Sequence, residues 1–381
     1  MHPIAARAQL LTAHRIVVKI GSSSLTGADG HLNLEALRSL VQVIADRHDL
    51  GLQTLLVTSG AVAAGIGPLG LPSRPRDVAT AQAAASVGQG MLVARYAEAF
   101  ADRAITVGQI LLTAEDTVRR TRYKNAQRSL ERLFRLGVVP IVNENDAVVT
   151  DELRFGDNDR LAALVAQLVG ADALVLLTDV DGLYDGPPSR EGTRRITEVL
   201  GPSDLEGIEV SGRGSDVGTG GMLTKLESVS IATGSGIPVV LTKADNARPA
   251  IAGERVGTWF APTGKRSSRK RLWIAHAARV QGKVVLDDGA VDAVLGGRAS
   301  LLAAGIVGVE GEFVAGDPVE LVSKSGAVIA RGLSGFDSVE IPEMLGQSSS
   351  VLRESLGSGY DREVIHRDDL VLVRPKGLRV N

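Results

Sequence analysis

The chain has 381 residues, of which 44% are hydrophobic and 23% are charged, as in ordinary globular proteins large enough for two domains. The formal net charge of -2 argues against a nucleic-acid or membrane partner for the whole chain. The chain has no cysteine, which excludes disulfides and thiolate metal sites. No secretory leader and no membrane-spanning stretch is visible, so we expect a cytoplasmic protein.

Strand and helix patterns alternate along the first two thirds of the chain. Strands are predicted at 15–20, 53–58, 105–112, 138–142, 173–178 and 238–242, and helices at 34–45, 76–101, 116–136, 158–169 and 222–233. This alternation, with apolar β-branched strands, predicts an α/β fold: a three-layer αβα sandwich with a mostly parallel central sheet. Ligands of such a sheet bind beyond the carboxyl ends of the strands.

The pattern changes in the polar, basic segment 263–272, which we interpret as a linker. It separates a predicted catalytic domain at 1–262 from a small β-rich domain at 273–381. Short strands in that domain are predicted at 283–286, 306–309, 318–321, 327–330 and 370–373.

Two lysine–glycine motifs indicate phosphate binding. Lys19 ends a buried strand and is followed by Gly21 and Ser22, so an ammonium and free backbone N–H groups could meet phosphate oxygens. Lys225 follows a glycine-rich loop in the first turn of a predicted helix, where a cation is normally disfavoured. The structural alternatives are a lysine at a strand edge and an ordinary glycine-rich loop.

Two acid–amide clusters, Asn143–Asp146 and Gly156–Asp159, lie about a dozen residues apart and suit a hairpin over a polar ligand. A calcium loop is excluded because the EF-hand spacing is absent, but a plain Asx-rich turn remains possible for either cluster alone. Ser59 and Gly60 follow the second strand and suit carboxylate binding, with an ordinary helix N-cap as the alternative. The G-x-G-x-x-G match at 65–70 follows no strand directly, so a dinucleotide site is disfavoured, and no P-loop is present.

Together these motifs resemble the amino acid kinase family, and within it the branch that phosphorylates free glutamate. The resemblance covers nearly the whole chain. It rests on VVKIGSSSLT (17–26), VTSGAVAAG (57–65), NENDAV (143–148) with FGDND (155–159), LLTDVDGLY (176–184) and GTGGMLTK (218–225). RKRLWI (269–274) opens a segment that looks like a PUA domain, an RNA-associated module.

The resemblance implies that ATP is the co-substrate and that the γ-carboxylate of L-glutamate is the phosphoryl acceptor. Lys19 and Lys225 would act on the transferring phosphoryl group, with Asp157 between them orienting both. Glutamate would be held by Ser59, Gly60, Asn143, Asp146, Asn158 and Asp159. The nucleotide would contact Lys19, Gly21, Ser22, Thr178, Asp179, Thr219, Gly220, Gly221, Met222, Leu223, Thr224 and Lys225.

The resemblance also implies Mg²⁺ bound mainly through the ATP phosphates, feedback inhibition by proline, and a homodimer or homotetramer. Two alternatives stay open: another amino acid kinase, of the acetylglutamate kinase or aspartokinase type, and an RNA-binding protein acting through the PUA-like domain. RNA binding is disfavoured because residues 273–381 carry 11 Lys and Arg against 15 Asp and Glu.

Overall fold

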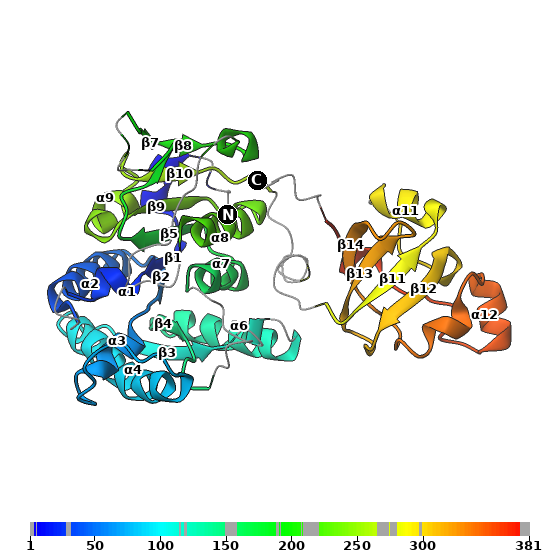
Figure 1. The fold of residues 1–381 in the computed structure, drawn as a ribbon, viewed down its shortest axis with the longest axis horizontal. Helices are drawn as coiled ribbons and strands as arrows, with labels where there is room; N and C mark the ends of the chain where they lie inside the picture. The colour runs from blue at the N-terminus through cyan, green and yellow to red at the C-terminus, as the bar shows by residue number, and fades with distance from the viewer. Residues whose placement is uncertain are drawn as a thin grey trace. The chain divides into compact units, whose positions relative to one another are not determined.

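The computed structural model describes residues 4, 6–27, 32–113, 116–117, 120–148, 158–187, 190, 192–206, 208, 221–264, 274, 280–296 and 299–373. The chain divides into two compact units, Met1–Ser267 and Ser268–Asn381 (Figure 1). The division falls within the segment 263–272.

The first unit is built on an eight-stranded sheet in the order β3-β4-β2-β1-β5-β9-β10-β8. Its strands are β1 (Arg15–Ile20), β2 (Gln53–Val57), β3 (Val107–Leu112), β4 (Val139–Glu144), β5 (Ala173–Thr178), β8 (Glu198–Val199), β9 (Val239–Lys243) and β10 (Thr258–Phe260). All neighbouring strands are parallel except β9 and β10. The predicted mostly parallel sheet is confirmed. A separate hairpin consists of β6 (Leu183–Tyr184) and β7 (Arg195–Ile196).

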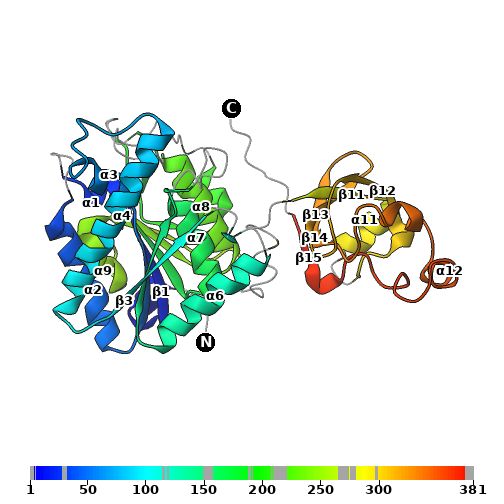
Figure 2. The same cartoon turned by 90° about the horizontal axis from the view of Figure 1, so that it is seen from below.

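Helices cover both faces of this sheet. They are α1 (Ser22–Leu25), α2 (Leu34–Asp49), α3 (Ala61–Ile66), α4 (Val78–Ala101), α6 (Arg120–Arg135), α7 (Asn158–Val169), α8 (Met222–Gly234) and α9 (Ala247–Ile251). Figure 2 shows α2, α4 and α9 on one side of the strands and α6, α7 and α8 on the other. This is the three-layer αβα arrangement that the alternation predicted.

The faces of β1 decide where Lys19 points. Ile16, Val18 and Ile20 belong to the core cluster that includes residues of α2, α4 and α9. Successive side chains of a strand point to opposite faces. Lys19 therefore points to the face covered by α7 and α8.

The largest difference from the predicted elements is α3, which the sequence patterns did not indicate. With six residues and a glycine at position 65, it is too short to display a helical period. The strands β8 and β10 were missed for the same reason, because two or three residues show no alternation.

The second unit has its own sheet, in the order β12-β11-β13-β14-β15, and its own apolar core. Its elements are β11 (Gly282–Leu286), α11 (Asp288–Leu295), β12 (Ile306–Gly311), β13 (Pro318–Ser323), β14 (Val328–Leu333), α12 (Ser349–Ser355) and β15 (Leu370–Leu372). The predicted small β-rich domain is confirmed, although α11 and α12 were not predicted. In the described parts of both units, no helix has the length and apolar character needed to cross a bilayer.

Candidate active site

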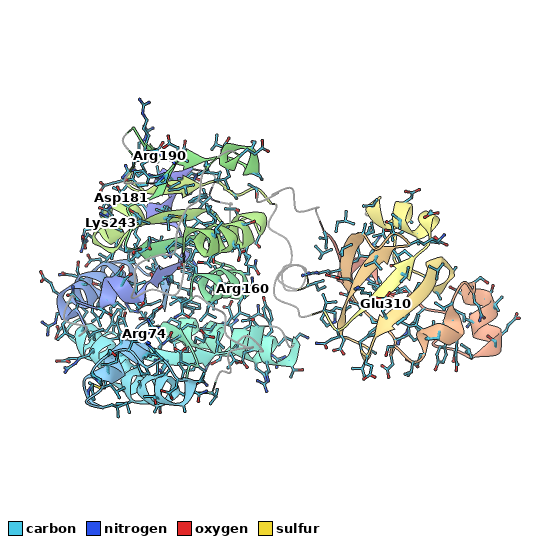
Figure 3. The ribbon with its side chains drawn as sticks, viewed as in Figure 1. Arg74, Arg160, Asp181, Arg190, Lys243 and Glu310 are labelled. Carbon is cyan, nitrogen blue, oxygen red and sulfur yellow. The ribbon has the colours of Figure 1, made fainter. Side chains whose placement is uncertain are left out.

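The polar motifs gather at the carboxyl edge of the first sheet, because each follows a parallel strand. Gly21 follows β1, Ser59 follows β2, Asn143 lies near the end of β4, and Asp179 follows β5. Lys243 ends β9 at the same edge, where it pairs in register with Thr178 of β5 (Figure 3). The sheet thus brings together residues that are far apart in sequence.

One buried carboxylate joins the two lysines. Asp159 Oδ1 lies 2.5 Å from Lys19 Nζ, and Asp159 Oδ2 lies 3.1 Å from Lys225 Nζ. All three side chains are buried, at 4% exposure for Lys19, 8% for Lys225 and 1% for Asp159. Asp159 lies in the first turn of α7, where the helix dipole favours a negative charge. Because the trio has two cations and one anion, it suits a site for a further anion.

Asp159 lies between the two ammonium groups, a position for which Asp157 was predicted, whereas Asp159 was predicted among the glutamate ligands. Asp159 reaches both lysines from the first turn of α7, which begins at Asn158. Asp157 lies outside the described residues, as do Thr219 and Gly220, so its role stays a prediction.

The first turn of α8 contributes the second lysine. Gly221 is its N-cap, and Thr224 Oγ1 donates a 2.8 Å hydrogen bond to the Gly221 carbonyl. Met222 and Thr224 are half-buried, and Leu223 is exposed. On the β1 side, a Cβ on Gly21 would lie 3.6 Å from Lys19 Nζ, so glycine leaves open space beside that ammonium. Both lysines are thus flanked by glycine backbone suited to anion binding.

A network of amides connects three elements beside the lysines. Asn158 Nδ2 is 2.8 Å from the Thr58 carbonyl, 2.8 Å from Ser59 Oγ and 2.9 Å from Asn143 Oδ1. Asn143 Nδ2 in turn donates to Gln89 Oε1 of α4 at 2.6 Å. Asn158 therefore contacts both Ser59 and Asn143, and all three were predicted as glutamate ligands.

Other predicted ligands border this network. Gly60, the N-cap of α3, has φ of 98°, a left-handed conformation that favours glycine. Asp146 is half-buried in the turn after β4. Behind the network, Thr58 Oγ1 and the Tyr96 hydroxyl lie 3.0 Å apart. Burial raises the pKa of the Tyr96 phenol, so Tyr96 stays neutral at physiological pH.

The segment after β5 forms the other side of the site. Thr178 Oγ1 donates to Asp179 Oδ1 at 2.8 Å. Asp181 accepts hydrogen bonds from Tyr184 at 2.8 Å and from Arg195 at 3.0 Å, which fixes this segment to the β6–β7 hairpin. Burial opposes ionisation of Asp181, but these two hydrogen bonds outweigh it and hold the pKa of the carboxyl below its ordinary value.

In the described part of the chain, no three His, Cys, Asp or Glu side chains cluster as a protein-bound metal ion would require. Among these described residues, Asp159 is engaged by two ammonium groups and not arranged with other carboxylates around a cation.

Three residues of this edge were not assigned from sequence. Gln89 and Tyr96 lie in the alanine-rich α4, and their partners are on β4 and after β2. No local pattern reveals such contacts. Lys243 could have been found, because like Lys19 it stands at the carboxyl end of a predicted strand.

Comparison with known proteins agrees with this geometry. The amino acid kinase family matches residues 14–243, and the PUA domain matches residues 282–356. Glutamate 5-kinase of Streptomyces avermitilis is 57% identical over 97% of this chain and 100% of its own length. Glutamate 5-kinase of Thermobifida fusca is 57% identical over 97% of this chain and 95% of its own length. Glutamate 5-kinase of Bifidobacterium longum is 57% identical over 96% of this chain and 98% of its own length.

Most of the chain is matched by the family, and nearly all of it by these relatives. The chain therefore belongs to the amino acid kinase family, in the group of the glutamate 5-kinases, with a carboxyl-terminal PUA domain.

Proposed function

We propose that the protein transfers the γ-phosphoryl group of ATP to the side-chain carboxylate of L-glutamate. The product is L-glutamyl 5-phosphate, which begins proline biosynthesis. The observation that carries the proposal is the pair of buried lysines held by Asp159, since two fixed cations suit a transferring phosphoryl group.

The chemistry requires neutralisation rather than a general base. A glutamate side chain, with a pKa of about 4.3, is already ionised at neutral pH. Its carboxylate must approach an anionic triphosphate, so catalysis depends on positioning the reactants and offsetting their charge. Lys19 and Lys225 supply the offsetting charge, and Asp159 holds both ammonium groups in place.

Glutamate is held by the amide network and its neighbours. Ser59, Gly60, Asn143 and Asn158 bind it with their amide, hydroxyl and backbone groups, and Asp146 binds the α-ammonium group. Amides and N–H groups suit carboxylates, whereas a carboxylate suits an ammonium.

ATP lies along the glycine-bearing edge. Its phosphates meet Lys19, Gly21, Ser22 and the segment Thr219–Lys225, and the rest of the nucleotide contacts Thr178 and Asp179. Magnesium enters as part of the MgATP substrate, because the phosphates themselves supply oxygen ligands.

A coupled ADP-release assay tests the proposal. Purified protein should release ADP with MgATP and free glutamate, and much less with N-acetylglutamate or aspartate. Release with aspartate or N-acetylglutamate at the rate seen with glutamate would assign the protein to another branch of the family.

N-Acetylglutamate is the more informative of the two alternative substrates, because it differs from glutamate only in its acetyl group. The acetyl group removes the α-ammonium charge and leaves Asp146 without its ionic partner, so kcat/KM should fall by roughly a thousandfold. Asp146→Asn should raise the glutamate KM strongly and leave the ATP KM nearly unchanged. If parent and variant share one glutamate KM, Asp146 does not bind the ammonium group.

Regulation and assembly are proposed from family membership. We propose that proline inhibits the enzyme at or near the glutamate site and that the chain forms a homodimer or homotetramer. Proline should then raise the apparent glutamate KM, and sedimentation should give an integral multiple of the 39.8 kDa chain.

A further inference from the structure

Gln89 lies at the far end of the amide network, where it contacts Asn143, one of the residues that we place on glutamate. Its side chain is 9% exposed, and its Oε1 accepts a hydrogen bond from Asn143 Nδ2 at 2.6 Å. Asn143 in turn contacts Asn158 at 2.9 Å. The chain Gln89–Asn143–Asn158 thus joins α4, β4 and α7 by side-chain amides alone.

The approach of α4 to the network depends on glycine. A Cβ on Gly65 of α3 would lie 2.0 Å from the Ala84 carbonyl oxygen of α4, and a Cβ on Gly88 would lie 1.9 Å from the Ala61 carbonyl oxygen of α3. Both distances are far inside van der Waals contact, so the two helices touch through their backbones. Gln89 follows Gly88 directly, and this contact sets its distance from β4.

The hydrogen bonds fix which way each amide faces. Asn143 Oδ1 accepts from the Glu144 backbone N–H at 2.9 Å, so its Nδ2 must face the other way, toward an acceptor. Gln89 Oε1 is that acceptor. With Asn143 Oδ1 facing α7, Asn158 directs Nδ2 toward it.

Two buried polar atoms are left over. Asn158 Oδ1 and Gln89 Nε2 are buried, and neither forms a hydrogen bond with any residue that the structure describes. Buried polar atoms are rarely left without a partner in folded proteins, because the desolvation cost is not recovered. The acceptor Asn158 Oδ1, which lies in the same side chain that contacts Ser59, is therefore suited to a hydrogen-bond donor of a ligand.

We infer that Gln89 is a positioning residue for the amino-acid substrate: through Asn143 it orients the Asn158 amide and leaves Asn158 Oδ1 to accept a hydrogen bond from the α-ammonium group of bound glutamate. This inference rests on the proposed function, since it takes glutamate as the ligand of Asn158. Gln89 acts through Asn143 and does not itself touch a reacting atom.

The test is steady-state kinetics of the full-length chain with Gln89→Met and Gln89→Glu. Methionine matches glutamine in length but offers only a weak thioether acceptor, so Asn143 Nδ2 loses its amide partner. The glutamate KM should rise about tenfold to a hundredfold, the scale of one unpaired buried polar group, while the ATP KM stays within about twofold. Gln89→Glu keeps an oxygen acceptor at this position and should bring the glutamate KM back toward that of the parent.

A double-variant cycle separates positioning from direct contact. If Gln89 acts through Asn143, then Gln89→Met should add nothing to the glutamate KM of Asn143→Leu. Additive effects would overturn the inference. So would a glutamate KM of Gln89→Met equal to that of the parent.

Gln167→Met is the matched control. Gln167 is also buried in the same unit, at 1% exposure, but its Nε2 contacts the Ile231 carbonyl at 3.1 Å and Ser235 Oγ at 2.6 Å, away from the network. Gln167→Met should lower the melting temperature without raising the glutamate KM. If it raises the glutamate KM as much as Gln89→Met does, the effect at Gln89 reflects a general loss of stability.

The failure of the proposed function and the failure of the role of Gln89 are distinguishable. If the parent releases no ADP with glutamate, the proposed function fails. If the parent releases ADP and Gln89→Met keeps the glutamate KM of the parent, only the role of Gln89 fails.

Discussion

Replacing Asp159 with asparagine removes the charge that holds Lys19 and Lys225 together. Asp159 is 1% exposed and lies 2.5 Å and 3.1 Å from the two ammonium nitrogens, so the substitution leaves both lysines buried without this carboxylate. Breaking a buried ion pair typically costs about 3–5 kcal/mol. At about 2–4 °C per kcal/mol, the melting temperature should fall by about 6–20 °C.

Activity should fall as well, because the lysines lose their fixed position. We expect kcat to drop by at least about a hundredfold, the scale of losing one preorganised electrostatic group. A triphosphate should partly replace the missing negative charge. A non-hydrolysable ATP analogue should therefore raise the melting temperature of Asp159→Asn more than that of the parent.

Asp157→Asn provides the comparison, because the family resemblance implies that Asp157 lies between the two lysines. Melting is followed by differential scanning fluorimetry with and without the analogue, and kcat by ADP release. The reasoning is refuted if Asp159→Asn keeps the stability and kcat of the parent, or if Asp157→Asn alone shows the combined loss and the stronger rescue by the analogue.

Further predictions concern the phosphoryl site, helix packing, ionisation and domain organisation. Lys225→Ala should lower kcat at least about a hundredfold and raise the ATP KM less; a change in ATP KM alone would make Lys225 a binding residue. Gly65→Ala should reduce the free energy of unfolding by about 1–3 kcal/mol in urea titrations, whereas Gly90→Ala on the open face of α4 should not reduce it. Burial raises the pKa of Tyr96, so the folded state keeps a proton that the unfolded chain loses above about pH 10. The free energy of unfolding should therefore fall as pH rises past that value, and less steeply in Tyr96→Phe. Ending the chain after Pro262 should leave ADP release with glutamate intact, since every residue assigned to chemistry precedes it; a folded but inactive truncate would contradict this.

The sheet was predictable because its central strands are mostly apolar and are buried on both faces. β1 and β5, for example, are buried along their whole length, and their predicted and observed bounds coincide. Runs of this kind alternating with long helical patterns leave few arrangements other than a parallel sheet. Strand β10, which is antiparallel to β9, escaped prediction because three residues show no alternation.

The site was predictable as a set of motifs but not as a set of contacts. Asp159 reaches both lysines from the first turn of α7, and a sequence pattern does not give the first residue of a helix to within one or two positions. The hydrogen bond between Gln89 and Asn143 spans 54 residues and depends on how closely α3 approaches α4. Neither feature follows from local spacing, because both are set by packing between elements.

The position of β1 in the sheet bears on how the protein folds during synthesis. β1 emerges first, yet it lies between β2 and β5 and is covered on one face by α7. The ammonium group of Lys19 therefore stays hydrated until the ribosome has synthesised the chain as far as β5. Asp159 stands on α7, the helix that comes directly before β5 in the chain. Asp159 is therefore synthesised together with the elements that bury Lys19. As a result, the ammonium group of Lys19 need not be buried without its carboxylate partner at any stage of folding.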